Sequence, residues 1–290
     1  MPTTDAHTTV IHYDVFGPAS DHTLLLINGL GSQLINWDPA FCRRFVDRGV
    51  QVVVFDNRDV GLSAKTPGPV PDVRAVTAAF RDGRAGDVAP YSLSDMAGDA
   101  IAVLDAVGVD RAHVAGMSMG GMIAQRLAIT WPDRVRSLTS IMSTTGAPGV
   151  GRGSAEAVAT LSAPTPSDRA GFIRHEVETR QATAGDHFDA DYWADHAGRI
   201  YDRCFHPDGW AFQMAAVVAD GDRTADLAAV DVATLVIHGR LDPLIGLSGG
   251  EATAAAVPGA QLLVIDSMGH DLPEPIWDDV VAAIVDQIIG

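Results

Sequence analysis

The sequence has few of the residues that mark secreted or membrane proteins. Only two cysteines, Cys42 and Cys204, occur in 290 residues, and they match no disulfide framework or metal-ligand spacing. We therefore expect two free thiols in a reducing compartment. No apolar run reaches the about 18 residues that a transmembrane helix needs, and the N-terminus lacks the basic and apolar regions of a signal peptide. These absences predict a cytoplasmic protein without a membrane-spanning segment.

Positive charge is also scarce. Lys65 is the single lysine, and 37 acidic against 20 basic residues give a net charge of −17. A field of this sign repels phosphate backbones and anionic lipid surfaces, which argues against a nucleic-acid or membrane partner. The partners that we expect instead are a small-molecule substrate and, as an open alternative to a monomer, a second copy of the chain in a homodimer.

Short β-rich runs alternate with helical patterns over most of the chain. This alternation predicts an α/β fold, in which a mostly parallel sheet carries helices on both faces. Strands are expected at residues 8–16, 23–27, 50–55, 113–116, 137–142, 234–237 and 261–265. Helices are expected at residues 36–48, 92–107, 119–129, 168–180, 247–256 and 273–289.

The strand pattern stops between residues 146 and 230. This stretch contains Pro- and Gly-rich joints and amphipathic helical segments, and it is too long for a loop inside a compact α/β domain. We therefore predict a helical cap, or lid, at 146–230. It would be inserted into a core domain that is formed by residues 1–145 and 231–290.

The most specific motif is HVAGMSMGGM at residues 113–122, a G-x-S-x-G pattern centred on Ser118. A β-rich run precedes it and a helix follows it at once, which is the context that a nucleophilic serine requires. Gly116 and Gly120 leave room for a sharp, strained turn that lifts the Ser118 hydroxyl to the carboxyl edge of the sheet. The alternative is a Gly-rich packing turn with an incidental serine, and the strand–turn–helix context favours the nucleophile over it. We predict that Ser118 is a nucleophile.

A serine hydroxyl needs a base to act as a nucleophile. His270, in the sequence SMGHD, follows the last predicted strand and is therefore expected at the same edge of the sheet. Asp242, in HGRLDP, directly follows the strand at 234–237. An Asp before Pro is also a common turn former, but the chain order Ser118, Asp242, His270 fits a serine hydrolase triad. We predict that His270 is the general base and that Asp242 orients it.

Two backbone N–H groups should stabilise the oxyanion that such a triad generates. One is expected from Met119, the residue after the nucleophile. The other is expected from Leu30, in the Asn-Gly-Leu-Gly-Ser loop after the first buried strand, where Gly29 and Gly31 let the backbone turn toward the substrate.

Large side chains of the predicted cap should shape the substrate pocket. Most of them would form the core of the cap itself, and a minority would line an apolar pocket over Ser118. The predicted pocket residues are Trp37, Tyr192, Trp193, Trp210, Phe212 and Met214.

Five motifs together resemble the α/β-hydrolase fold family over nearly the whole chain: INGLG, FDNRDVGLS, GMSMGG, HGRLDP and SMGH. The combination is most similar to bacterial carboxylesterases, including lipase/esterase-like proteins of actinobacteria, and to anthracycline methylesterases. This resemblance implies a sheet of the eight-stranded type and a carboxylic ester substrate of small or medium size and apolar character. It also implies an acyl-enzyme intermediate without a metal or cofactor. Many members have His-Gly where this chain has Asn28-Gly29, so a histidine role in that loop is absent.

The predicted triad leaves other reactions open. Acyl transfer, cofactor-free peracid formation of the haloperoxidase type and carbon–carbon bond hydrolysis use the same three side chains. Outside the enzymes, a ligand-binding protein on a hydrolase fold is the alternative. Such proteins usually lose a member of the triad, and no member is missing from this sequence.

Overall fold

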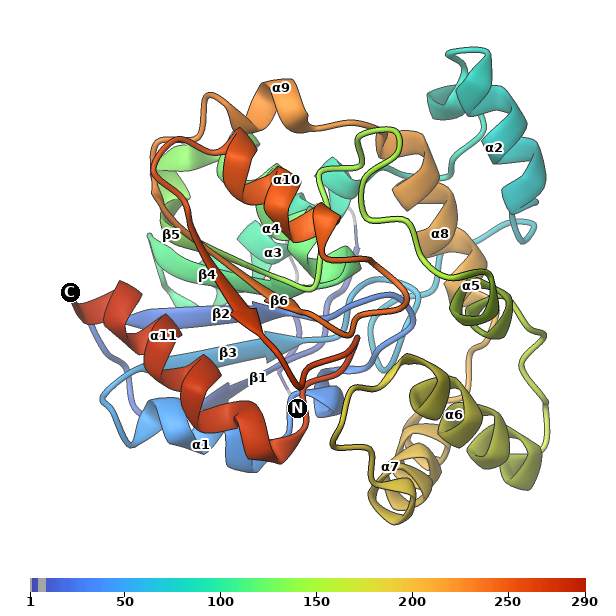
Figure 1. Cartoon of the computed structure of the whole chain (residues 1–290), viewed down its shortest axis with the longest axis horizontal. Helices are drawn as coiled ribbons and strands as arrows, with labels where there is room; N and C mark the ends of the chain where they lie inside the picture. Colours follow the sequence, from blue (N-terminus) through green and yellow to red (C-terminus); the bar gives the residue numbers. More distant parts are fainter. Residues whose placement is uncertain (1, 5–8) are drawn as a thin grey trace.

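Seven strands form one sheet in the order β1-β3-β2-β4-β5-β6-β7, in a computed structural model that describes residues 2–4 and 9–290 (Figure 1). Only β1 runs antiparallel to its neighbour β3. The strands are β1 (Tyr13–Phe16), β2 (Thr23–Ile27), β3 (Gln51–Phe55), β4 (Ala112–Met117), β5 (Val135–Ile141), β6 (Ala233–Gly239) and β7 (Gln261–Ile265).

The N-terminal part of the sheet differs from the prediction. Within the described ranges the sheet has seven strands and not eight, because Thr3 meets His12 only in an isolated antiparallel bridge. The strand expected at 8–16 begins at Tyr13, and residue 8 lies outside the described residues. The mostly parallel α/β architecture itself is as predicted.

Eleven α-helices accompany these strands in the part of the chain that the structure describes. The helices before β6 are α1 (Pro39–Val46), α2 (Val73–Arg81), α3 (Leu93–Val107), α4 (Met119–Thr130), α5 (Ala155–Leu161), α6 (Arg169–Thr183), α7 (Ala190–Arg203), α8 (Gly209–Asp220) and α9 (Thr224–Leu227). Those after it are α10 (Ser248–Ala256) and α11 (Trp277–Ile289). Short 3₁₀ turns occur at η1 (Leu34–Asn36), η2 (Ala85–Asp87), η3 (Pro132–Arg134) and η4 (Glu274–Ile276). Among the described α-helices outside residues 146–230, α2 is the one that was not predicted from the sequence.

The sheet separates two hydrophobic cores, because side chains alternate between its faces along each strand. Leu25 and Ile27 of β2 belong to the core beneath α3, α4 and α10, whereas Leu24 and Leu26 belong to the core beneath α1 and α11. Figure 1 shows these two helix layers on opposite sides of the sheet. All residues of β2 and β3 are buried, as expected for strands that are covered on both faces.

Helix α3 illustrates how local sequence sets an element. Its N-cap Ser92 accepts a hydrogen bond from the Asp95 N–H, and the Asp95 side chain accepts one from the Ser92 N–H, which completes a capping box. The helix ends at Gly108, whose φ of 79° lies in the left-handed region that glycine favours. Both ends agree with the prediction.

The stretch between β5 and β6 contains helices α5–α9 and no strand. Figure 1 shows α5–α8 grouped at one end of the sheet, while α9 lies back beside α10. Helices α6 and α7 share a small core of Phe172, Ala197 and Ile200. Arg203 of α7 pairs with the buried Asp56 after β3 at 2.7 Å, which fastens these helices to the rest of the protein.

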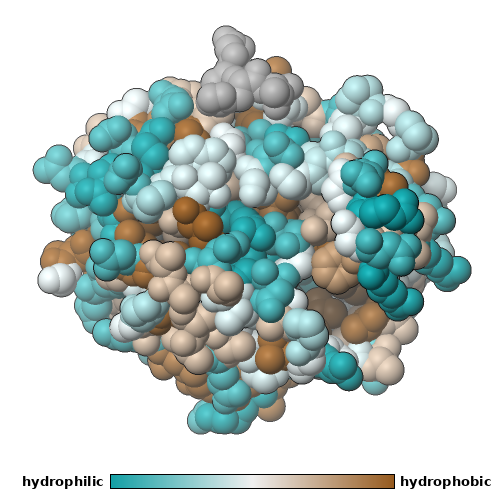
Figure 2. Space-filling view, turned by 90° about the horizontal axis from the view of Figure 1, so that it is seen from above, coloured by the Kyte–Doolittle hydropathy of each residue, from teal (hydrophilic) through white to brown (hydrophobic). Residues whose placement is uncertain are grey.

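The surface seen from above has hydrophilic side chains spread between hydrophobic ones (Figure 2). None of the described helices is long and apolar enough to cross a membrane. Cys42 and Cys204 are both free thiols, as predicted, and burial raises the pKa of Cys42 to about 12.

Candidate active site

Ser118 occupies a one-residue turn between β4 and α4. Its backbone has φ 56° and ψ −122°, a strained conformation for a residue with a side chain. The surrounding glycines make this turn possible. A Cβ on Gly116 would lie 2.0 Å from the Gly120 carbonyl oxygen, and one on Gly120 would lie 2.1 Å from the Ile27 carbonyl oxygen. Glycine at these two positions therefore permits backbone contacts that a residue with a side chain would prevent.

Three polar side chains that are distant in sequence meet beyond the carboxyl ends of β4, β6 and β7. His270 Nε2 lies 3.0 Å from Ser118 Oγ, and His270 Nδ1 lies 2.7 Å from Asp242 Oδ2. The Asp242 side chain is fully buried, and its second oxygen accepts hydrogen bonds from the N–H groups of Leu244 and Ile245 at 2.9 and 2.8 Å. These two bonds hold the carboxylate in the orientation that faces the imidazole.

The arrangement favours one tautomer of His270. A carboxylate can only accept, so Nδ1 donates to Asp242 and leaves the Nε2 lone pair directed at the Ser118 hydroxyl. A second imidazole, His238, lies 3.6 Å from Asp242, and its Nε2 donates to the Ile245 carbonyl oxygen at 2.8 Å. Burial lowers the pKa of His238, which favours its neutral form.

The loop of His270 is fastened to the turn after α6. The His270 N–H donates to the Thr183 carbonyl oxygen at 2.7 Å. Asp271 Oδ1 accepts from the N–H groups of Gly269 and Gly185 at 3.0 and 3.2 Å. Burial raises the pKa of Asp271. The end of α6 and the turn after it thus help to hold the imidazole in place.

The turn after β2 lies against Ser118. A Cβ on Gly29 would lie 3.3 Å from Ser118 Cβ, and the Ser32 N–H closes the turn on the Gly29 carbonyl oxygen at 3.2 Å. Within the described part of the chain, neither the Leu30 N–H nor the Met119 N–H donates to another group. Both are available to an oxyanion beside Ser118.

A cavity of about 570 Å³ opens over Ser118 and His270, a size typical of small-molecule sites. Four of the six predicted pocket residues line it: Trp37, Tyr192, Trp193 and Trp210. No group of three or more His, Cys, Asp or Glu side chains arranged to hold a metal ion occurs among the described residues.

The prediction was wrong for Phe212 and Met214, which do not line the cavity. Phe212 is 3% exposed and packs into the core beneath α3 and α4. Trp210 reaches the cavity from the first turn of α8, and Met214 lies one turn farther along the helix. Met214 therefore shares the face of Trp210 but lies too far along the helix to line the cavity. Because α8 is apolar around most of its circumference, its sequence did not indicate that Phe212 turns toward the core instead.

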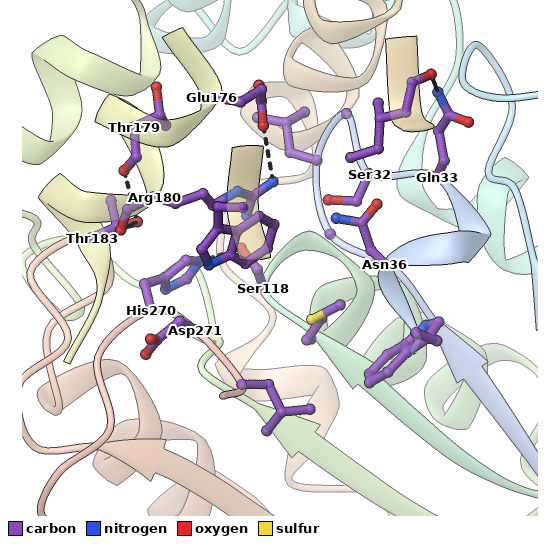
Figure 3. A pocket seen from close by; sticks show the side chains of 18 of the residues that line it. Ser32, Gln33, Asn36, Ser118, Glu176, Thr179, Arg180, Thr183, His270 and Asp271 are labelled. Carbon is purple, nitrogen blue, oxygen red and sulfur yellow. Dashed lines mark hydrogen bonds and ion pairs between the residues drawn. The ribbon is translucent and has the colours of Figure 1, made fainter. Parts of the chain in front are cut away.

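The cavity also has a polar wall that the sequence motifs did not indicate. Figure 3 shows Glu176, Thr179, Arg180 and Thr183 of α6 on one side of Ser118 and His270, with Ser32, Gln33 and Asn36 on the other. The Arg180 guanidinium lies 4.6 Å from the Trp193 ring centre and 3.5 Å from the Glu176 carboxylate. The signal was present, since the four α6 residues recur at helical spacing on one face.

A profile of the alpha/beta hydrolase fold matches residues 22–274. The chain belongs to this family. It is 28% identical to rhodomycin D methylesterase DnrP of Streptomyces peucetius, over 92% of this chain and 91% of that protein. It is also 26% identical to 3-oxoadipate enol-lactonase 2 of Acinetobacter baylyi, over 91% and 88%.

A solved structure of a hydrolase from Pseudomonas aeruginosa PA01 is similar over 97% of this chain and 95% of that one, with 25% identity and a TM-score of 0.71. Together with the two relatives above, it confirms the predicted family. The chain is an esterase-like α/β-hydrolase.

Proposed function

We propose that this α/β-hydrolase is a serine esterase that cleaves a carboxylic ester of a small or medium apolar substrate. Ser118 is the nucleophile, His270 the general base and Asp242 the acid that orients the base. The observation that supports this most directly is the unbroken series of short distances from Asp242 through His270 to Ser118, which opens into the cavity.

The proposed reaction transfers the acyl group of the ester to Ser118 and then to water. Ser118 Oγ attacks the ester carbonyl carbon while His270 Nε2 takes its proton. The negative oxygen of the tetrahedral intermediate accepts hydrogen bonds from the Leu30 and Met119 N–H groups. His270 returns the proton to the leaving alcohol, and an acyl-enzyme remains. Water that is activated by His270 releases the acid and restores the free serine.

We further propose that residues 146–230 act as the cap and set the choice of substrate. Helices α6 and α7 supply Arg180, Tyr192 and Trp193 to the cavity wall, so the cap combines aromatic surface with a polar ridge. The relative DnrP is a methylesterase, which makes methyl esters of bulky acids the first substrates to test. A cytoplasmic location and a homodimer stay predictions.

The test is a screen of p-nitrophenyl esters of graded chain length beside methyl esters of bulky acids. Ser118→Ala should lower kcat by roughly 10⁶-fold, because the nucleophile and its base act as one unit. Ser137→Ala is the matched control. Ser137 is a buried serine near the start of β5, so it lies toward the amino ends of the strands, opposite the edge that carries Ser118. Its loss should leave kcat unchanged.

A fluorophosphonate probe checks the same assignment without a substrate. It should label the wild-type protein and not the Ser118→Ala variant. Wild-type turnover in Ser118→Ala, or a folded wild-type protein that the probe does not label, would remove the proposed nucleophile. Repeating the assay with an added alcohol or with hydrogen peroxide separates hydrolysis from acyl transfer and peracid formation.

A further inference from the structure

Helix α8 brings a buried amide side chain to the loop that carries one of the proposed oxyanion donors. Gln213 is 0% exposed. Its Oε1 accepts a hydrogen bond from the Gly31 N–H at 2.8 Å, and its Nε2 donates to the Arg58 carbonyl oxygen at 2.7 Å. One side chain of the inserted segment therefore joins the loop after β2 to the loop after β3.

The position of Gln213 is set by the packing of α8. Gly209, Phe212, Gln213 and Ala216 recur at helical spacing and form the buried face of the helix. Gly209 approaches the Asp59 carbonyl oxygen so closely that a Cβ would lie 2.0 Å from it. Phe212 and Ala216 pack into the main core. The helix cannot shift without disturbing these contacts, so the amide is held in one place.

The chemistry of the two partners calls for an amide. The Gly31 N–H needs an acceptor and the Arg58 carbonyl needs a donor, and a glutamine side chain supplies one of each. A buried polar group that loses such a partner destabilises the folded state, because it is left without the hydrogen bond that water would otherwise supply. Because both ends of Gln213 are satisfied, the side chain stabilises one conformation of each loop.

The Gly31 N–H belongs to the central peptide of the turn from Gly29 to Ser32. A central peptide of this kind can flip between two turn types, and φ of 69° at Gly31 corresponds to the type that requires a positive φ at this position. Gln213 accepts from that peptide and blocks the flip. The Leu30 N–H lies in the preceding peptide, and anchoring the peptide that follows Leu30 restricts the movement of this residue beside Ser118.

We propose that Gln213 is a positioning residue that holds the Leu30 N–H toward the reacting oxygen. The inference rests on the proposed esterase function. Gln213 does not line the cavity, so it acts through the loop and not on the substrate. The inserted helices then contribute to the rate of the reaction as well as to the fit of the substrate.

The decisive variant is Gln213→Met, which keeps the volume and removes both hydrogen bonds. It should lower kcat by about 10- to 100-fold, less than the about 10²–10³ expected for outright loss of an oxyanion donor. KM should change little, because the ground-state ester does not use this donor fully. A trifluoromethyl ketone forms a tetrahedral oxyanion with a serine, so its Ki should rise by the factor by which kcat/KM falls.

Two further variants separate positioning from general destabilisation. Gln51→Met removes a buried amide at the start of β3, where Gln51 accepts a hydrogen bond from Thr23 at 3.1 Å, and should lower Tm without changing kcat or Ki. Gln213→Glu tests the hydrogen bonds directly. A protonated carboxyl has the donor and acceptor of an amide, so its kcat relative to wild type should rise as the pH falls from about 8 to 6.

The outcomes are distinguishable from failure of the esterase proposal. If wild type is inactive toward every ester and unlabelled by the fluorophosphonate, the proposed function itself fails. If wild type is active and folded Gln213→Met matches it in kcat and in Ki, the positioning role is wrong. Should Gln213→Met not fold, a pH-independent, wild-type kcat of Gln213→Glu overturns the inference instead.

Discussion

Two buried carboxylates flank His270, and their surroundings give them different properties. Asp242 meets the imidazole and two backbone N–H groups. Asp271 accepts from two backbone N–H groups, but burial is the largest influence on it and raises its pKa. A raised pKa means that the folded protein binds this proton more tightly than the unfolded chain does. The ionised Asp271 therefore lowers the stability of the folded state at neutral pH.

Replacing Asp271 with Asn should increase stability at neutral and alkaline pH. The amide oxygen can still accept from Gly185 and Gly269, and the buried charge is removed. The gain in stability should be largest near pH 8, where Asp271 of the wild-type protein is ionised. It should shrink as the pH falls toward the raised pKa of Asp271, because the wild-type side chain then becomes protonated as well. Urea unfolding of both proteins between pH 8 and 5 measures this difference. A gain that grows as the pH falls would contradict it.

At the scale of the element, the β4–Ser118–α4 unit depends on close backbone contact. Gly116, Gly120 and Gly121 leave no space for a side chain, since added Cβ atoms would lie 2.0 to 2.6 Å from their neighbours. Gly98, in the middle of α3, is different. The nearest atom to its Cβ would be the Trp131 ring at 3.8 Å, which is ordinary van der Waals contact.

Equivalent glycine-to-alanine changes in the two helices should have opposite effects. Gly120→Ala should destabilise the protein by at least about 1–3 kcal/mol, because the methyl group meets the Ile27 carbonyl, and should also lower turnover. Gly98→Ala should stabilise it by about 0.5–1 kcal/mol, because glycine is a poor helix former. Thermal unfolding and ester turnover of both variants provide the measurement. Equal changes in stability and turnover in the two variants would show that the close contact at Gly120 is not required for the turn at Ser118.

On the scale of the whole molecule, buried histidines make stability depend on pH. Burial is the largest cause that lowers the pKa of both His113 and His196 to about 4. Below pH 6.5 the unfolded chain binds protons at these positions that the folded protein does not bind. Stability should therefore fall as the pH decreases from about 6.5 to 4. The two residues lie in different parts of the fold, in β4 and in α7, so the effect is global.

Replacing His113 with Asn should make the free energy of unfolding less dependent on pH in this window. One histidine contributes at most about 1.4 kcal/mol per pH unit to the slope, and the variant should lose part of that contribution. Loss of packing will lower stability at every pH, so the slope and not the absolute value is the test. Urea midpoints at half-unit steps from pH 7 to 4.5 measure it. An unchanged slope would mean that His113 titrates as it does in the unfolded chain.

The periodicity of the sequence predicted most of the elements, because buried strands and amphipathic helices have distinct local patterns. Helix α3 is the clearest case, since its cap at Ser92 and its stop at Gly108 are local signals. Helix α2 was missed although its sequence carries local signals, an N-cap at Asp72 and a glycine with positive φ, Gly83, just after its end. Phe212, Met214 and Gln213 could not be placed, because the buried face of α8 is chosen by its distant neighbours.

Sequence alone determined where the candidate catalytic residues lie along the chain. A serine between a strand and a helix, with glycines on either side, is a local requirement of backbone geometry, and the family membership follows from such motifs. Tertiary structure decided what these positions meet. The distance from His270 to Ser118, the polar wall of α6 and the contact between Gln213 and Gly31 join residues that are far apart in the chain. Such contacts depend on strand order and helix packing, which no short stretch of sequence encodes.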